Sequence, residues 1–418
     1  MLFWILQTGE PMHTDITNAR PMRAMNLSNY LTSRGDKVHI FTSNFYHQEK
    51  KHRFNGLFSK KVSDKLKITF INSMGYKKNI GLMRIIDHMQ LGLNLKNELK
   101  KTDEAPDIIF IGYPPIDAAY EMVRFGKNKN IPMVLDVKDQ WPDLLIEKLP
   151  SRFHFLGKLL FFHYFYESKK IFDHIDGFSV TSNSFKEWVR AKISNDGIIK
   201  KFNVSPLAGP DISLSASDIE QCKDFWKKNK INLNHNNRIF FAGTLSQAFD
   251  FDFLVTIASQ LRQKIKNFEF VVCGHGPRFK EVKNLMKDLS NVKVIGWVEY
   301  SKILYLSKFS IGTIAPYKNT QNFLDNIPNK IIDSLSFGLP IITMLEGETK
   351  LLLDKYSIGI SDKNVNSIIE YISKLSNNPI GFESLSAEIT ELHRKKFSYK
   401  SVHQKLENFL LNVIDEKK

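Results

Sequence analysis

The sequence predicts an α/β protein with two doubly wound parallel sheets. Short apolar runs alternate with amphipathic segments of helical length, and the alternation starts again in the second half of the chain, after Pro210. Strands that alternate with helices of roughly 10–18 residues form βαβ units with parallel strands. The chain has 418 residues, enough for two or three domains. Two Rossmann-like domains facing one cleft are the simplest architecture.

The first half contains five short apolar runs and three segments of helical spacing. The basic stretch 47–67 has no clear period, so we expect a loop there. The expected strands are residues 2–6, 37–41, 107–112, 132–137 and 177–181, and the expected helices are 21–34, 82–99 and 118–127.

The second half repeats this architecture without repeating the sequence. Its expected strands are 238–243, 268–274, 292–296, 309–314 and 339–344, and its expected helices are 251–263, 278–289, 298–308 and 329–337. A last helix over 398–414 has no strand after it. We therefore expect one domain over residues 1–205 plus the C-terminal helix 398–418, and a second over 206–397. Ligands of such sheets bind outside the carboxyl ends of the strands.

Composition excludes several classes of protein. Hydrophobic residues make up 42% and charged residues 25% of the chain, as in ordinary globular domains. Two cysteines without a CxxC motif exclude a disulfide framework and a cysteine-based zinc site, and they favour a reducing, intracellular location. The formal net charge of +15 favours nucleic acid, anionic lipid or phosphorylated substrates as partners.

One apolar segment, residues 153–166, raises the question of a membrane. It is too short to span a bilayer, so the expectation is a soluble or peripheral protein. Residues 1–7 lack the features of a targeting signal and are better interpreted as a first buried strand. The segment 153–166 is apolar nearly all round, so it either dips into a membrane interface or is buried between domains.

A polar motif, DVKDQWPD at 136–143, follows the strand 132–137. Asp139 in this motif is suited to accept hydrogen bonds from a sugar hydroxyl or to act as a base. The alternative is a capped turn, because Asp before Trp-Pro is good local turn chemistry.

Three glycine-containing or acidic motifs follow strands of the second half. FAGTLS at 241–246 leaves backbone N–H groups available for an anion, or is an ordinary βα turn. Asp250 and Asp252 form a DxD triplet that opens a helix, where capping is favoured over metal binding. The GxG at 274–276 indicates a tight turn that lets a ligand approach the backbone, but it is not a dinucleotide fingerprint.

The richest stretch is 316–340, where a loop enters a helix through Pro328. Lys330 lies in the first helical turn, where a cation opposes the helix dipole unless an anion binds there. Asp325 and Asp333 are eight residues apart. One such carboxylate can bind a ribose diol while helix N–H groups and a lysine bind a diphosphate. The alternative is a surface helix with a solvated Lys–Asp pair.

Taken together, these motifs resemble the retaining GT-B glycosyltransferases of family 4. The closest resemblance is to bacterial transferases of O-antigen, capsule and colanic acid synthesis, including proposed N-acetylfucosaminyl transferases. The resemblance extends over nearly the whole chain. It rests on residues 6–10, 20–25, 45–50, 136–142, 241–245, 274–277, 296–298, 315–317, 328–333 and 338–340.

The resemblance implies a nucleotide-sugar donor held mainly by the C-terminal domain, with uridine as the expected base, and a transfer that needs no metal or other cofactor. It implies that Asp333, in place of the family's usual Glu, binds the ribose, and that Asp139 lies near the transferred sugar. Thr244 and Phe249-Asp250 stand where many members carry an Arg and a Lys, so the diphosphate must be neutralised from elsewhere, and Lys330 and its helix start are the candidates. The implied catalytic residues are Asp139 and Lys330, and the implied donor-binding residues are Gly9, Gly243, Thr244, Leu245, Gly274, His275, Gly276, Trp297, Asp325, Asn329, Lys330 and Asp333.

The resemblance also implies an acceptor bound by the N-terminal domain, such as an undecaprenyl-diphosphate-linked saccharide, and a C-terminal helix that crosses back to that domain. With the basic balance it implies a peripheral location on the cytoplasmic face of an anionic membrane. Two alternatives remain: a sugar-nucleotide 2-epimerase of the same fold, and a nucleic-acid binder. The second rests on net charge alone, because the basic residues are scattered and no nucleic-acid motif occurs.

Overall fold

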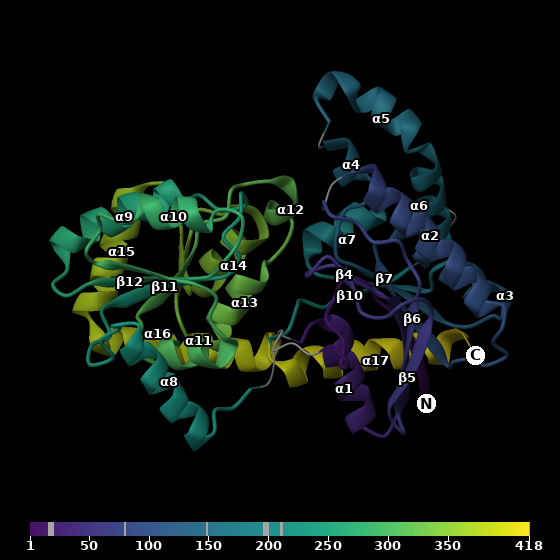
Figure 1. The fold of residues 1–418 in the computed structure, drawn as a ribbon, viewed down its shortest axis with the longest axis horizontal. Coiled ribbons are helices and arrows are strands. Elements are labelled where there is room, and N and C mark those ends of the chain that lie inside the picture. The colour runs from purple at the N-terminus through teal and green to yellow at the C-terminus, as the bar shows by residue number, and fades with distance from the viewer. Residues whose placement is uncertain (16–20, 79–80, 148, 195–199, 210–211, 418) are drawn as a thin grey trace. The chain divides into compact units, whose positions relative to one another are not determined.

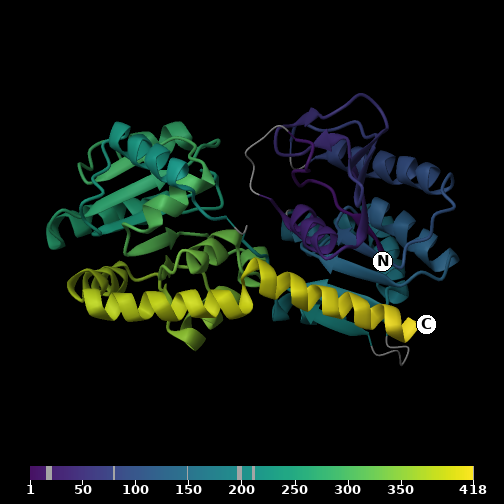
Figure 2. The ribbon, with the colours of Figure 1, turned by 90° about the horizontal axis from the view of Figure 1, so that it is seen from below.

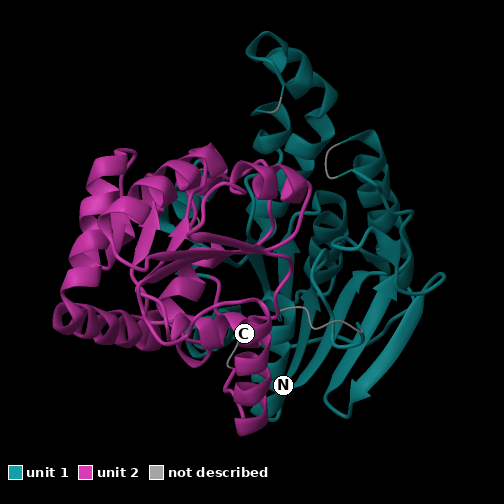
Figure 3. Cartoon of the chain, turned by 60° about the vertical axis from the view of Figure 1, so that its left-hand side comes forward, with its two compact units in different colours: residues 1–206, 402–418 teal, residues 207–401 magenta. Residues whose placement is uncertain are grey.

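The computed structural model describes residues 1–15, 21–78, 81–147, 149–194, 200–209 and 212–417. The chain divides into two compact units, which Figure 3 colours separately. Unit 1 comprises residues 1–206 and 402–418, and unit 2 comprises residues 207–401. The boundaries expected from the sequence lie one and four residues from these. Arg20 of one quoted motif, and Pro210, lie outside the described residues.

Unit 1 contains an eight-stranded sheet in the order β10-β9-β8-β7-β1-β2-β6-β5. Its strands are parallel except for β5, which pairs antiparallel with β6 at the edge. The inner strands are apolar because helices cover the parallel sheet. The strands are β1 (Leu2–Leu6), β2 (Lys37–Ser43), β5 (Phe58–Ser63), β6 (Leu66–Ile71), β7 (Ile108–Tyr113), β8 (Met133–Val137), β9 (Gly177–Val180) and β10 (Lys201–Val204).

The prediction of a loop over residues 47–67 is wrong. This stretch contains β4 (Lys51–His52), which pairs with β3 (Phe45–Tyr46), all of β5 and the start of β6. The apolar period is missing because every residue of β5 is exposed. Lysines at an exposed edge strand discourage pairing with another chain, and they also conceal the strand from a hydrophobicity pattern.

The helices of unit 1 include one that comes from the far end of the sequence. Glu407 of α17 accepts hydrogen bonds from Tyr30 at 3.1 Å and pairs with Arg34 at 2.9 Å. The chain therefore crosses back to its N-terminal unit, and Figure 2 shows α17 lying along it. The helices are α1 (Arg23–Ser33), α2 (Leu82–Leu99), α3 (Ile116–Asn128), α4 (Asp143–Glu147), α5 (His154–Leu160), α6 (Phe162–His174), α7 (Asn183–Arg190) and α17 (Tyr399–Lys417) (Figure 1).

Unit 2 contains a six-stranded, fully parallel sheet in the order β13-β12-β11-β14-β15-β16. Its strands are β11 (Arg238–Ala242), β12 (Glu269–Cys273), β13 (Val292–Ile295), β14 (Gly312–Ala315), β15 (Ile341–Thr343) and β16 (Gly359–Ser361). The helices are α8 (Ala216–Lys228), α9 (Phe251–Lys264), α10 (Phe279–Leu285), α11 (Tyr300–Ser307), α12 (Gln321–Leu324), α13 (Asn329–Ser336), α14 (Gly347–Tyr356), α15 (Val365–Asn377) and α16 (Pro379–Lys396).

Each sheet has a point where the strand order reverses. In unit 1 the first strand, β1, lies between β2 and β7, and in unit 2 the first strand, β11, lies between β12 and β14. The crevice at the carboxyl end of such a reversal is where open α/β sheets bind ligands. The two reversals therefore locate one candidate binding edge in each unit.

Candidate functional site

In unit 2, Lys330 ties a helix to the central strand. It lies in the first turn of α13, between β14 and β15 in the chain, and its ammonium donates a hydrogen bond to the carbonyl oxygen of Ala242, the last residue of β11. The ammonium also lies 5.0 Å from the centre of the Phe241 ring and 5.5 Å from that of Phe249. A cation is thus held at the start of a helix, beside the carboxyl end of the central strand.

Three glycines bring the neighbouring turns against each other. A side chain at Gly243 would come within 1.5 Å of the Lys330 ammonium, and one at Gly274 within 1.9 Å of the Gly243 carbonyl oxygen. Gly276 approaches the Leu245 carbonyl oxygen in the same way, at 2.6 Å. All three have positive φ angles, between +151° and +157°, which glycine adopts at little cost. The close approach of the turns after β11 and β12 therefore requires these glycines.

The other residues predicted from these turns differ in exposure. Thr244 is exposed, whereas the side chain of Leu245 is fully buried, so only its backbone can face a ligand. His275 stacks on Phe279 with the ring centres 4.8 Å apart. Trp297, just after β13, is 62% exposed. An exposed indole at the carboxyl edge of a sheet offers a flat apolar face for a base.

The two aspartates of the D-x7-D pair have different surroundings. Asp325 accepts two hydrogen bonds from the Gln321 side chain, both at 3.0 Å. Asp333 lies on α13 with Asn329 and Lys330, and it is half-buried. Burial, and then the charge of Asp333, raises the pKa of Tyr317. Asp333 therefore lies on the helix that carries Lys330, whereas the carboxylate of Asp325 is engaged by its own short helix.

Asp250 caps a helix, as expected. Its carboxylate accepts the backbone N–H of Phe253 at 3.1 Å at the start of α9. Arg278 lies nearby: it donates to the Phe249 carbonyl oxygen at 3.1 Å, and its pKa is raised chiefly by its hydrogen bond to Glu281. A separate hollow in unit 2, lined by α14, α15 and α16, includes none of the predicted donor residues.

In unit 1, a lysine links the end of β1 to the end of β8. The ammonium of Lys138 donates to Gln7 at 2.6 Å and to the buried carboxylate of Glu10 at 2.7 Å. The second oxygen of Glu10 accepts the backbone N–H of Ala24 at 2.9 Å. Gly9, with φ +74°, lies in the same turn after β1. Sequence reasoning missed Gln7, Glu10 and Lys138, although they occur in motifs that carried the resemblance.

The two aspartates that flank Lys138 differ in role. Asp136 is fully buried and forms a two-point pair with Arg23, with N–O distances of 3.1 and 3.2 Å. Ser179 also donates to it at 2.8 Å, so Asp136 joins α1, β8 and β9. Asp139 lies past the strand in a bend and is half-buried. Asp139 is therefore the carboxylate of this pair that lies at the open edge of the sheet.

The apolar segment 153–166 is helical for most of its length and belongs to unit 1. It folds as a 3-10 turn (Ser151–Phe153), α5 and the start of α6, with the break at Phe161. Among the described residues, no helix is both long and apolar enough to span a bilayer. Large apolar side chains of this apolar segment are exposed, with Phe155 at 77%: Phe153, Phe155, Leu156, Leu159, Leu160, Phe162 and Tyr166.

Part of unit 2 matches a known protein family. Residues 236–378 match the family model for glycosyl transferases group 1. An uncharacterized glycosyltransferase of Haemophilus influenzae is 24% identical over 157 residues, which is 36% of this chain. The match spans less than half of that relative, 43% of its length.

Solved structures resemble the chain over nearly all of its length. Sucrose-phosphate synthase of Thermosynechococcus elongatus superposes with a TM-score of 0.71 at 12% identity, over 99% of both chains. HepE of Anabaena, in complex with UDP and glucose, gives 0.63 at 11% identity, over 99% of this chain and 100% of its own. WaaG, a glycosyltransferase involved in lipopolysaccharide biosynthesis, gives 0.63 at 12%, over 98% and 99%.

These findings define the class. The chain has the GT-B fold, with two parallel sheets and a long C-terminal helix. Residues 236–378, which match the family model for glycosyl transferases group 1, include β11, the glycine turns and α13.

Proposed function

We propose that the protein is a retaining glycosyltransferase that moves a sugar from a nucleotide-sugar, most simply a UDP-sugar, to a lipid-linked or saccharide acceptor in surface-polysaccharide synthesis. The observation that carries the proposal is Lys330, held at the strand reversal of unit 2 by the Ala242 carbonyl oxygen and the rings of Phe241 and Phe249. The group 1 match over the same residues supports it.

In this proposal the donor diphosphate lies at the start of α13. Lys330 and the start of the helix neutralise its charge, which is the role that helix starts play for phosphates. Asp333, one turn further along, binds the ribose diol, and the exposed Trp297 lies flat on the base. The glycines let the turns after β11 and β12 pack against each other and against Lys330. The backbone of these turns, at Gly243, Thr244, Gly274, His275 and Gly276, faces the diphosphate and sugar.

The chemistry follows from charge. The bond between the anomeric carbon and the diphosphate breaks more easily when preorganised donors stabilise the departing oxygen, and Lys330 with the helix start supplies such donors. The acceptor hydroxyl attacks on the face from which the diphosphate leaves, so the anomeric configuration is retained. Its proton passes to the leaving phosphate oxygen, and Asp139 positions the sugar. This scheme requires no metal.

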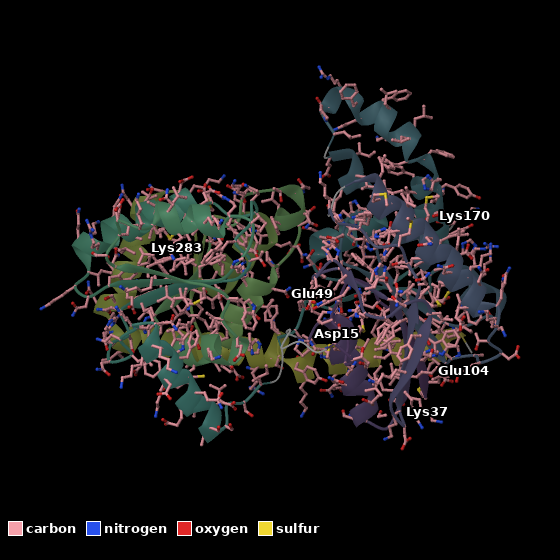
Figure 4. All side chains as sticks on the ribbon, viewed as in Figure 1. Asp15, Lys37, Glu49, Glu104, Lys170 and Lys283 are labelled. Atoms are coloured by element: carbon pink, nitrogen blue, oxygen red, sulfur yellow. The ribbon has the colours of Figure 1, made fainter. Side chains whose placement is uncertain are left out.

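The acceptor side of the proposal rests on unit 1. The exposed apolar segment 153–166 contacts the membrane. The lysines of α5 and α6 attract anionic lipid; they are Lys158, Lys169 and Lys170, of which Figure 4 labels Lys170. Each lysine near such a surface contributes about 1 kcal/mol. Location on the cytoplasmic face of a membrane, with an undecaprenyl-diphosphate-linked saccharide as acceptor, is consistent with this surface. WaaG, which has the same fold, acts in lipopolysaccharide synthesis.

The test is a transfer assay with UDP-sugars and polyprenyl-diphosphate saccharides, in which the product's anomeric configuration is read by NMR. The proposal predicts a product whose configuration equals that of the donor. An inverted product would contradict the retaining mechanism. A sugar epimerised at C2 without any acceptor would identify a 2-epimerase instead.

A further inference from the structure

A cluster of basic and aromatic side chains lies at the carboxyl edge of unit 1, apart from the residues assigned to donor and sugar. Lys50 follows β3, Tyr76 follows β6 and Arg84 lies in the first turn of α2. The Lys50 ammonium lies 4.6 Å from the centre of the Tyr76 ring and 3.1 Å from Nδ1 of His47. Arg84 lies over the same Tyr76 ring at 5.6 Å and over that of Trp141 at 5.0 Å.

The electrostatics of this cluster favour an anion. Burial, and then the charge of Arg84, lowers the pKa of Lys50, and burial with both cations lowers the pKa of His47 to about 4. Two positive groups are therefore held close enough to repel each other. Lys50 also adopts a left-handed backbone with φ +56°, which is uncommon for a residue with a side chain.

The cluster also has acidic neighbours. Asp87 accepts the backbone N–H of Gly75 at 2.7 Å and faces Arg84, and burial raises its pKa. Glu49 pairs with Lys51. His52, which also faces Asp87, hydrogen-bonds the Ser73 carbonyl oxygen at 2.8 Å.

A buried histidine gives independent support for a ligand. His88, one turn after Arg84 on α2, is 5% exposed, and its Nδ1 has no hydrogen-bond partner among the described residues. Its ring lies 5.5 Å from Trp141 and 6.3 Å from Tyr76, the two rings that Arg84 covers. Burial, and then the charges of Arg84 and His47, lowers the pKa of His88 to about 3. A buried polar atom without a partner suggests a ligand atom that would satisfy it.

The same helix carries an exposed apolar stripe. Leu82, Ile86, Met89 and Leu93 follow each other at spacings of four, three and four residues, which is one helical face, and they are 44–71% exposed. The opposite face of α2, including His88 and Leu91, is buried. The basic cluster therefore lies at the start of a helix whose open face suits a lipid chain or a bilayer surface.

We propose that Lys50, Arg84, His47 and His88 form a phosphate-binding site for the phosphate or diphosphate of a lipid-linked acceptor, whose chain follows the Leu82–Leu93 face of α2. The proposal rests on the proposed function and assigns the part of unit 1 that recognises the acceptor. Helix N–H groups at the start of α2 add donors for the same anion.

The test compares the full-length protein with two double variants by calorimetry. The probes are farnesyl diphosphate, farnesol and inorganic pyrophosphate, with UDP measured in parallel. Lys50→Gln with Arg84→Gln removes two site charges, and Lys77→Gln with Lys78→Gln removes two exposed charges just before α2 as the matched control. Lys50→Gln alone serves if the double variant unfolds at a lower temperature.

We expect the site variant to lose about tenfold or more in farnesyl diphosphate affinity, because hydrogen bonds to charged groups are among the strongest and two of them are removed. The control variant should bind like the wild type, and UDP affinity should be the same in all three. Equal losses in both double variants, or no binding of farnesyl diphosphate, would overturn the site. If pyrophosphate binds as tightly as farnesyl diphosphate, the lipid chain does not contribute to binding, and its placement on the Leu82–Leu93 face of α2 is overturned. A wild type that binds farnesyl diphosphate but not UDP would instead contradict the transferase proposal.

Discussion

The ammonium of Lys330 donates a hydrogen bond to the carbonyl oxygen of Ala242, so α13 is tied to the end of β11. This contact occurs where the strand order of unit 2 reverses. Lys330→Gln should lower the affinity for a nucleoside diphosphate roughly 10- to 100-fold, because a charge-assisted hydrogen bond is lost. Isothermal calorimetry measures the loss. Lys283→Gln, an exposed lysine on α10 (Figure 4), is the control and should leave binding unchanged.

Gly243 should be needed for both stability and binding. Gly243→Ala places a methyl group where the Lys330 ammonium lies and forces a side chain into φ +151°. We expect a loss of about 1–3 kcal/mol in the free energy of unfolding, together with weaker UDP binding because Lys330 must move. Gly296→Ala, whose new methyl group meets open space, is the matched control. Equal melting temperatures of the two variants would contradict this reading of the turn.

Asp136 and Asp139 should respond differently to the same change. Asp136→Asn leaves the buried Arg23 without its charge partner, which typically costs about 3–5 kcal/mol of stability. Asp139→Asn should keep the melting temperature and UDP affinity of the wild type but lose most of the turnover. Denaturant unfolding and single-turnover transfer separate the two effects. Near-normal turnover in Asp139→Asn would remove its assignment near the transferred sugar.

Two half-buried carboxyls, one on α3 and one on α6, should make the stability of unit 1 sensitive to pH. Burial, with the charges of Asp117 and Glu121, raises the pKa of Glu167 to about 7, and burial raises the pKa of Asp117 to about 6. The folded state then holds protons that the unfolded state releases, so stability falls as pH rises from about 4.5 to about 7.

The variant Glu167→Gln replaces a titrating carboxyl by an amide that stays neutral, so this position no longer makes the free energy of unfolding depend on pH. It should melt above the wild type at pH 8 and close to it at pH 4.5, as followed by circular dichroism. The exposed Glu187→Gln on α7 serves as the control. A variant that is less stable than the wild type at pH 8 would show that the charged form of Glu167 is favoured in the fold.

The apolar segment 153–166 should control membrane binding without affecting donor binding. Phe155→Ser with Leu159→Ser removes two of its most exposed apolar side chains, at 77% and 67%. Each buried side chain of this size contributes about 1.5–3 kcal/mol, so vesicle affinity should fall at least tenfold in co-sedimentation with anionic vesicles. Leu351→Ser, an exposed leucine of unit 2, is the control. Wild-type binding that is independent of anionic lipid would contradict the proposed surface.

The fold was largely predictable because its strands are buried on both faces. The strand at β1 and the helix at α2 have the bounds expected from the sequence, and both carry strong apolar patterns. The edge strand β5 escaped prediction because all its residues are exposed. Residues 347–396 received no assignment, although α14, α15 and α16 lie there.

The candidate site was predictable only where a motif follows a strand. Gly243, Gly274 and Lys330 were found by their position after β11, β12 and β14. Tertiary contacts were not predictable: nothing in the sequence shows that Lys330 reaches Ala242, or that Lys138 reaches Glu10. The cluster of Lys50 and Arg84 also remained hidden, because its members come from three separate loops and helices.

The central claim is that unit 2 binds a nucleoside diphosphate, and thermal unfolding tests it most directly. The protein is melted with UDP, GDP, ADP and CMP, each with and without EDTA. A ligand at a hundred times its dissociation constant stabilises by about 2.7 kcal/mol, or about 2 °C or more for a chain of this size. We predict a shift with one nucleoside diphosphate, UDP, that EDTA does not change. The absence of a shift with every nucleotide would contradict the account, and a shift abolished by EDTA would contradict its metal-free chemistry.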